Sequence, residues 1–232
     1  ARSNALKTGQ INYMDRAELK TVHLMKKIPG INVSATTGTA HYTMPMLVDK
    51  KPYDDNNVRM ALKHVINRKE LLSQILQGYG EPGNDHPIAP VNRYFAKNMD
   101  KIEYDPDKAR FYMEKAGMLD HTFNLHAADA AFAGAVDAAV LMKEQAKKAG
   151  ININVVREPD DGYWSNVWMK KEWSMCYWGG RPIEDMMFSV AYSTGAPWND
   201  TLWDNKHFNE LLISARAELD TDKRRKLYYD MQ

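Results

Sequence analysis

The residue types that most often carry chemistry in proteins are present in this sequence, but their spacing builds no recognisable catalytic or metal site. The seven histidines stand singly, without metal-ligand spacing: His23, His41, His64, His86, His121, His126 and His207. Glu184 and Asp185 are adjacent carboxylates, and adjacent residues on a helix do not face each other. The simpler interpretation is that they are helix N-terminal charges, which the helix dipole favours. Signatures of serine hydrolases, nucleotide-binding enzymes and zinc proteases are absent from the sequence. We therefore expect a protein that is not an enzyme and has no cofactor.

Composition excludes several other classes. The chain has 232 residues, of which 44% are hydrophobic and 26% charged, as in an ordinary globular protein. Its 31 basic and 30 acidic residues leave a net charge of +1. A chain with so little net charge has no positive electrostatic field that would attract nucleic acid. The single Cys176 excludes an internal disulfide and a zinc thiolate cluster. No apolar run approaches the roughly 20 residues that a membrane-spanning helix needs.

Helical and extended segments alternate along the chain, which predicts α/β or α+β architecture. Asp54 and Asp55 can cap a helix whose buried face carries Val58, Ala61, Leu62, Val65 and Ile66. Asn67 can cap a second helix, with Leu71, Leu72, Ile75 and Leu76 inward and Gly78 at its end. A proline-rich loop then follows over residues 81–90, and Asp105-Pro106 begins another helix that Gly117 ends.

A strand–helix–strand unit is predicted over residues 123–156. Residues 123–126 alternate like a strand, residues 131–149 are an alanine-rich helix, and residues 151–156 form the next strand. Such a unit pairs its two strands in parallel. Beyond it we expect a short helix carrying Trp164 and Trp168, a strand over residues 173–178, and helices with loops to the end.

The segment from Lys51 to Gly117 carries motifs that resemble a known family. It reads KPYDDNNVRMALKHVINRKELLSQILQGYGEPGNDHPIAP and later YDPDKARFYMEKAG. The ordered pieces Pro52…Val58-Arg59, Asn67-Arg68, Pro87…Pro90 and Tyr104-Asp105-Pro106 are similar to those of extracellular solute-binding proteins of the peptide, nickel and opine type, family 5. The segments ALKTGQIN, LMKEQAKKAGININV and ELLISARAELDTDKRRKLYYDMQ extend the resemblance over the whole chain.

The resemblance implies an α/β fold of two lobes, the type II periplasmic-binding-protein fold, with a ligand cleft between the lobes. Residues 1–40 would belong to lobe I, residues 41–182 to lobe II, and residues 183–232 to an incomplete return into lobe I. The crossover segments would lie near residues 41–48 and 178–182, where Gly179-Gly180 allows large dihedral changes and Pro182 keeps Arg181 extended. Because family members are longer, we expect this sequence to be a fragment dominated by lobe II.

Arg181 marks a departure from the peptide-binding members. They carry Asp at this position, and that Asp pairs with the peptide's amine. A guanidinium instead holds carboxylate or phosphate, so we expect an anionic ligand group here. A shifted register would bring Glu184 or Asp185 to the site instead, and a solvated Arg181 at a strand end is the simplest alternative. The other expected ligand-binding residues are Trp178, Tyr42, Met46, Asp85, His86, Asp129 and Phe132.

The function implied by the resemblance is that of the periplasmic substrate-binding component of an ABC importer. Such a protein captures a peptide or another small polar ligand and delivers it to permease subunits in the inner membrane, and we expect it to act as a monomer. The alternative is a ligand-sensing domain of a transcriptional regulator, since some regulators fuse this fold to a helix-turn-helix.

Overall fold

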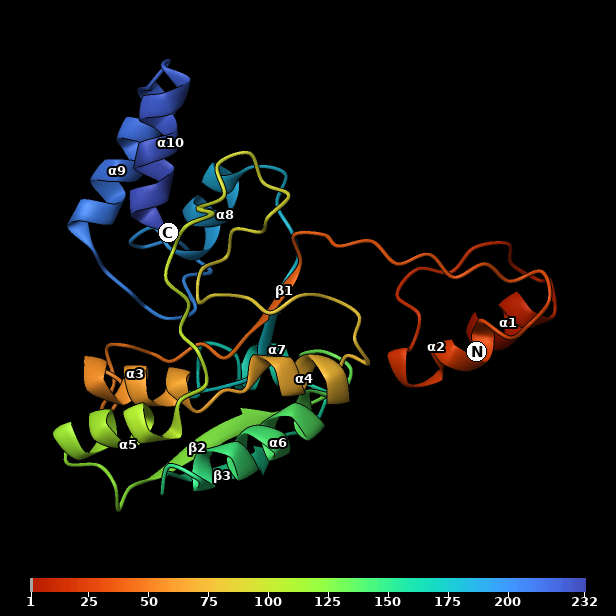
Figure 1. Ribbon diagram of the computed structural model, residues 1–232, viewed down its shortest axis with the longest axis horizontal. Helices are drawn as coiled ribbons and strands as arrows, with labels where there is room; N and C mark the ends of the chain where they lie inside the picture. Colours follow the sequence, from red (N-terminus) through yellow and green to blue (C-terminus); the bar gives the residue numbers. More distant parts are fainter. Residues whose placement is uncertain (1) are drawn as a thin grey trace. The chain divides into compact units, whose positions relative to one another are not determined.

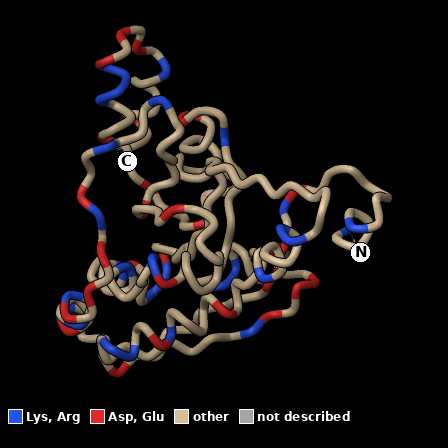
Figure 2. The backbone as a smooth tube through the Cα atoms, turned by 45° about the vertical axis from the view of Figure 1, so that its right-hand side comes forward, with Lys and Arg blue, Asp and Glu red and all other residues tan. Residues whose placement is uncertain are grey.

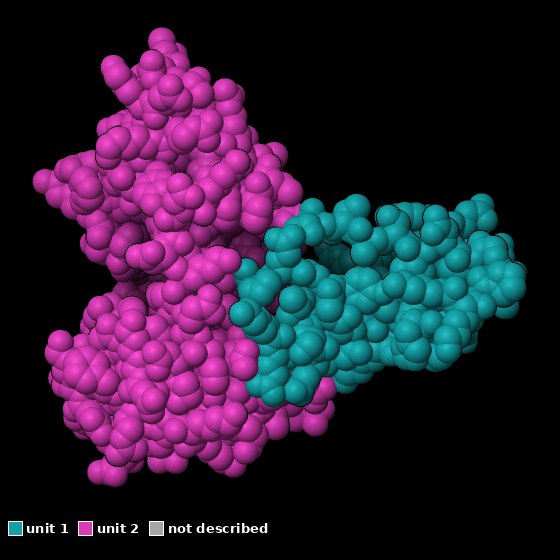
Figure 3. Space-filling view, in the orientation of Figure 1, with its two compact units in different colours: residues 1–37, 69–82 teal, residues 38–68, 83–232 magenta. Residues whose placement is uncertain are grey.

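A computed structural model describes residues 2–232 and divides the chain into two compact units (Figure 3). Unit 1 comprises residues 1–37 and 69–82, and unit 2 comprises residues 38–68 and 83–232. The division after Thr37 lies close to the predicted lobe boundary at residue 40. Residues 183–232 lie in the same compact unit as residues 83–182, so the predicted return into lobe I stays a prediction.

Unit 1 contains α1 (Arg2–Lys7), α2 (Leu19–Met25) and most of α4 (Arg68–Gln74). Val22 and Met25 are its buried apolar residues on α2. The helix α4 ends earlier than the sequence suggests, because Gln77 and Gly78 both have positive φ. The Gly78 amide donates to the Leu72 carbonyl at 2.9 Å, so one carbonyl of the last helical turn has a partner beyond the helix.

In unit 2, α3 (Asn56–His64) packs against α5 (Pro106–Lys115). Both helices begin where their capping residues predict. The Asp55 side chain accepts from the Asn57 amide, and the Asp105 side chain accepts from the Lys108 amide just before Pro106. Val58, Ala61 and Leu62 are buried as predicted.

The predicted strand–helix–strand unit is confirmed. β2 (Thr122–Ala127) and β3 (Asn152–Arg157) pair in parallel, and α6 (Ala135–Lys147) connects them (Figure 1). The helix begins later than the predicted residue 131, because Gly134 adopts a left-handed conformation at the N-cap. The Asn67 amide, just after α3, donates a hydrogen bond to the Gln145 side chain of α6. This bond links α3 to the strand–helix–strand unit.

The helix predicted to carry both Trp164 and Trp168 contains only Trp164. α7 spans only Tyr163–Asn166, and Met169 has a positive φ that turns the chain. The predicted strand over residues 173–178 is regular only in β4 (Cys176–Trp178), with isolated bridges at Trp173 and Ser174.

The rest of unit 2 is helical, as predicted: α8 (Glu184–Ala191), α9 (Lys206–Ala217) and α10 (Thr221–Met231). Phe188, Phe208 and Tyr228 from these helices share one apolar cluster with Ile88, Tyr94 and Trp178. The proline-containing loop before Tyr94 is therefore held against α8–α10. No helix among residues 2–232 is long and apolar enough to cross a membrane.

Candidate functional site

The centre of unit 2 is a short antiparallel pair of strands from distant parts of the chain, drawn between the βαβ layer and α8 in Figure 1. β1 (His41–Thr43) pairs with β4, and His41 lies opposite Trp178, Tyr42 opposite Tyr177, and Thr43 opposite Cys176. Side chains alternate between the two faces of a strand. One face of the pair therefore carries Tyr42 and Tyr177, and the other carries the remaining pairs. We call them the tyrosine face and the histidine face.

The tyrosine face extends into a row of aromatic rings. Tyr42 stacks on Phe132 with centroids 4.0 Å apart, and Tyr177 meets Trp164 edge-on at 5.4 Å. Tyr42, Tyr177 and Trp164 are each between 39% and 45% exposed. The structure thus brings together two predicted ligand residues, Tyr42 and Phe132. Sequence reasoning missed Tyr177, although its alternation with buried Cys176 and Trp178 was available as a signal.

Polar residues lie at the carboxyl ends of the parallel strands β2 and β3, the edge at which α/β sheets usually bind ligands. His126 Nδ1 lies 2.6 Å from Glu158 Oε1. The predicted residue Asp129 is exposed, and its side chain accepts from the amides of Gly134 and Val136 at 3.2 and 3.4 Å. Asp129 therefore caps the start of α6, as its place in a turn suggested.

Trp178, another predicted ligand residue, is buried on the histidine face. Its side chain is 5% exposed, and its indole N–H donates to Asp200 Oδ2 at 3.1 Å. Trp168 donates to the same oxygen, also at 3.1 Å. Burial raises the pKa of the Asp200 carboxyl, although both indole hydrogen bonds act in the opposite direction. Trp178 is thus part of the packed interior, and Asp200 is a buried polar partner that the sequence did not reveal.

Asp85 and His86 lie in the proline-containing loop, where Asp85 has φ of 57°. Asp85 forms an ion pair with Arg68, Oδ2 to Nη2 2.7 Å. Burial lowers the pKa of His86, and Asp85 partly offsets that effect. A charge on His41 would lower the pKa of His86 further, so the two imidazoles lie within electrostatic reach of each other.

Arg181 is half-buried, and its guanidinium turns back along its own segment. Nη1 donates to the carbonyl oxygens of Gly179 at 2.7 Å and Gly180 at 3.3 Å. Within the described residues 2–232 it forms no ion pair. A side chain would not fit at Gly180, because a Cβ there would lie 1.8 Å from Thr39 Oγ1. Crowding, and not an unusual backbone conformation, is therefore the reason for glycine at this position. The Gly-Gly pair thus allows close approach of the chain segments that precede β1 and follow β4.

Glu184 and Asp185 have structural partners at the start of α8. Glu184 is 3% exposed and accepts from the Tyr94 amide at 2.6 Å. Asp185 Oδ1 accepts from Arg216 Nε at 2.6 Å. Met46, the last predicted residue, is half-buried and pairs with Trp173 in an isolated bridge.

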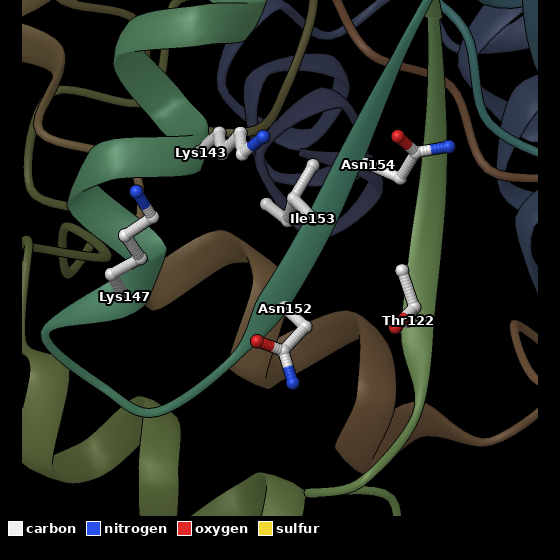
Figure 4. Close-up of a pocket in the computed structure, with 6 residues that line it drawn as sticks. All are labelled: Thr122, Lys143, Lys147, Asn152, Ile153 and Asn154. Atoms are coloured by element: carbon white, nitrogen blue, oxygen red, sulfur yellow. The ribbon is translucent and has the colours of Figure 1, made fainter.

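Two surface depressions lie away from these residues. One of about 340 Å³ is lined by Lys143 and Lys147 of α6 together with Thr122, Asn152, Ile153 and Asn154 (Figure 4). Thr122 and Asn152 are the first residues of β2 and β3, so this depression is at the amino ends of the strands, away from the usual ligand edge. Lys147 is already paired with Glu144 at 2.7 Å. Among residues 2–232, no group of three or more His, Cys, Asp or Glu could hold a metal ion.

Charge is dispersed over the chain. Lysines and arginines are interspersed with acidic residues along the helices (Figure 2). The strands β1 and β4 contain no charged residue. The central strands thus offer aromatic rings, one imidazole and a thiol, and burial raises the pKa of that thiol, on Cys176. A buried, protonated thiol is a poor nucleophile.

The family model for the middle region of bacterial extracellular solute-binding proteins, family 5, matches residues 1–200. The chain is 28% identical over 236 residues to the dipeptide-binding protein of Escherichia coli (strain K12), covering 92% of this chain and 40% of that protein. The structure resembles NikZ from Campylobacter jejuni in complex with Ni(L-His), with a TM-score of 0.85, 20% identity, and coverage of 99% and 49%. It also resembles AgaA in complex with agropinic acid from A.tumefacien R10, with a TM-score of 0.84, 19% identity, and coverage of 99% and 48%.

These likenesses define the class of the fold. It is that of the periplasmic binding proteins, and this chain corresponds to about half of their length. The chain belongs to the bacterial extracellular solute-binding proteins of family 5. It spans about half the length of the relatives that it matches, or less.

Proposed function

We propose that the protein is the periplasmic substrate-binding component of an ABC importer, which acts as a monomer and performs no catalysis. It would bind a small polar ligand between two lobes and deliver it to permease subunits in the inner membrane. Family membership over residues 1–200 is the observation that carries this proposal.

The lobe assignment in this proposal follows the family resemblance: residues 1–40 belong to lobe I, residues 41–182 to lobe II, and residues 183–232 to a return into lobe I. In the return, α8–α10 share an apolar cluster with Ile88, Tyr94 and Trp178, so they pack against the loop before Tyr94 and the end of β4.

Arg181 supplies an anion-binding group in this proposal. Its Nη1 is held by the Gly179 and Gly180 carbonyls, while a guanidinium has further N–H groups that can bind a carboxylate in two-pronged geometry. Replacing Arg181 by Ala in the full-length protein should weaken binding of a carboxylate ligand about tenfold or more, since a hydrogen bond to a charged group contributes about 1.5–3 kcal/mol. Arg110→Ala is the matched control, because Arg110 pairs with Glu114 on the exposed face of α5.

A ligand panel tests the function as a whole. The full-length protein is titrated with L-alanyl-L-alanine, glutathione, Ni(L-His) and agropinic acid, and its thermal unfolding is followed. A ligand present at about 100 times its dissociation constant should stabilise the folded state by about 2.7 kcal/mol. Chromatography of the mixture should recover the ligand unchanged. Absence of any thermal shift, together with purified protein that carries no small molecule, would contradict the proposal, as would ligand turnover.

A further inference from the structure

Two imidazoles, His41 on the histidine face and His86 in the proline-containing loop, have ring nitrogens that are buried and without a hydrogen-bond partner among residues 2–232. These atoms are Nε2 of His41 and Nδ1 of His86. Buried polar atoms in folded proteins nearly always have a partner, so each exception needs an explanation. The two rings come from segments far apart in the sequence, β1 and the proline-containing loop, yet lie within electrostatic reach of each other.

The Thr39 carbonyl determines which nitrogen of His41 carries the proton. Thr39 can approach Gly180 only because no Cβ stands there. The Thr39 carbonyl oxygen lies 3.2 Å from His41 Nδ1. A carbonyl can only accept, so Nδ1 carries the hydrogen. In a neutral imidazole the other nitrogen, Nε2, then presents a lone pair.

Both rings are neutral at pH 7. Burial is the main cause that lowers the pKa of His41 and also that of His86. The negative charge beside them belongs to Asp85, which Arg68 holds at 2.7 Å. His86 contacts Phe95 with ring centroids 5.8 Å apart, so an apolar ring lies against the imidazole.

We propose that His41 Nε2 and His86 Nδ1 form a subsite that accepts hydrogen bonds from an amino group of the ligand. This inference rests on the proposed function and gives the ligand class, a compound with a free amine. The lone pair of a neutral imidazole repels carboxylate oxygens, whereas an ammonium group offers three donors.

A plain packing role is the competing explanation, and the chain offers a control for it. His64 also has a buried Nε2 without a partner among residues 2–232, and its Nδ1 lies 2.9 Å from the Glu103 carbonyl oxygen. His64 stacks on Tyr112 within the α3–α5 layer, away from β1 and β4. If unpartnered imidazole nitrogens are only a packing feature, His64 and His41 should behave alike.

The test measures amine discrimination in the full-length protein by calorimetry. L-alanyl-L-alanine and glutathione are each compared with their N-acetylated forms, in the wild type and in His41→Phe, His86→Phe and His64→Phe. Because a hydrogen bond to an ammonium group is charge-assisted, the wild type should bind at least one free amine about tenfold more tightly than its acetylated form. His41→Phe and His86→Phe should lose that preference, and His64→Phe should keep it.

A second measurement, on the wild-type protein, tests the inference even if the histidine variants fail to fold. In wild-type protein labelled with ¹⁵N at histidine, NMR should show the Nδ1–H tautomer for His41, and the Nε2 signal should shift when the free amine binds. Equal binding of free and acetylated probes, or unchanged discrimination in the two variants, would overturn the inference while leaving the proposed function intact. Binding of agropinic acid alone would do the same. Failure of every panel compound to bind would count against the function itself.

Discussion

Asp200 provides a sharp test of how the interior of unit 2 is held together. Its carboxylate is 4% exposed and accepts two indole N–H groups, from Trp168 and Trp178, at 3.1 Å each. Asp200→Ala removes the acceptor and leaves both donors without it. An unsatisfied buried donor costs about 1–3 kcal/mol. Trp178 is buried and should bear that cost in full, whereas half-buried Trp168 can recover part of it from water. We expect a loss of about 2–4 kcal/mol in the free energy of unfolding.

Asp200→Asn separates the hydrogen bonds from the charge. The amide oxygen can still accept both indole groups, and no charge is buried. Burial raises the pKa of Asp200 above its ordinary 3.8, so the folded protein holds this proton more tightly than the unfolded chain does. This contribution to stability is full below pH 3.8 and is lost as the pH rises through the folded-state pKa. Relative to wild type, Asp200→Asn should therefore gain stability as the pH rises from about 4 to 7.

Urea denaturation of the full-length protein, followed by tryptophan fluorescence, measures both variants. Asp204→Asn is the matched control, because Asp204 is exposed and accepts from Thr194 Oγ1 at 2.8 Å. It should change the stability by less than about 0.5 kcal/mol. The reasoning is refuted if Asp200→Ala is as stable as Asp200→Asn, since the indole hydrogen bonds would then contribute nothing.

Three further predictions concern residues around the central strands. Gly180→Ala should lower the free energy of unfolding by about 1–3 kcal/mol in urea titrations, because its Cβ would lie 1.8 Å from Thr39 Oγ1; Gly179→Ala should be tolerated, since its nearest neighbour is Arg181 Nη1 at 3.7 Å. Glu184→Ala should cost about 1–3 kcal/mol by the same assay, because the buried Tyr94 amide loses its acceptor, and an unchanged midpoint would contradict this. Burial lowers the pKa values of His41 and His86 from 6.5, and Asp85 opposes the shift at His86. The two neutral imidazoles should therefore stabilise the folded state above pH 6.5, and this stabilisation should be lost as the pH falls through their folded-state pKa values. In thermal unfolding measured against pH, His41→Phe should reduce the loss of stability in that range.

Local signals predicted the elements of this chain well where neighbours in sequence decide the structure. Asp55 and Asp105 cap helices through hydrogen bonds to amides two and three residues ahead, and such spacing can be seen in the sequence. The parallel pairing of β2 and β3 follows from the strand–helix–strand order. Boundaries failed where backbone conformation intervened, as at Gly134 before α6 and at Met169 after α7.

The candidate site was harder to predict, because its contacts join residues far apart in the sequence. Tyr42 reaches Phe132, Glu184 reaches the Tyr94 amide, and Asp200 reaches Trp168. No periodicity encodes such pairs. Residue type alone selected Trp178 as a ligand contact, but its indole N–H found a buried acceptor, and the ring became part of the interior.

The segment 178–181 shows how one short sequence can serve several physical roles at once. The Trp178 ring is part of the apolar cluster, and Gly180 leaves room for the Thr39 side chain. The Thr39 carbonyl lies beside His41 Nδ1 and sets the tautomer of that imidazole. Arg181 donates to the Gly179 and Gly180 carbonyls through a single nitrogen, Nη1. A free amine would be held by His41 of β1 and His86 of the proline-containing loop, and a carboxylate by Arg181, which follows β4. A ligand with both groups would therefore be recognised by charge at each end, and acetylation of the amine and substitution of Arg181 should weaken its binding independently.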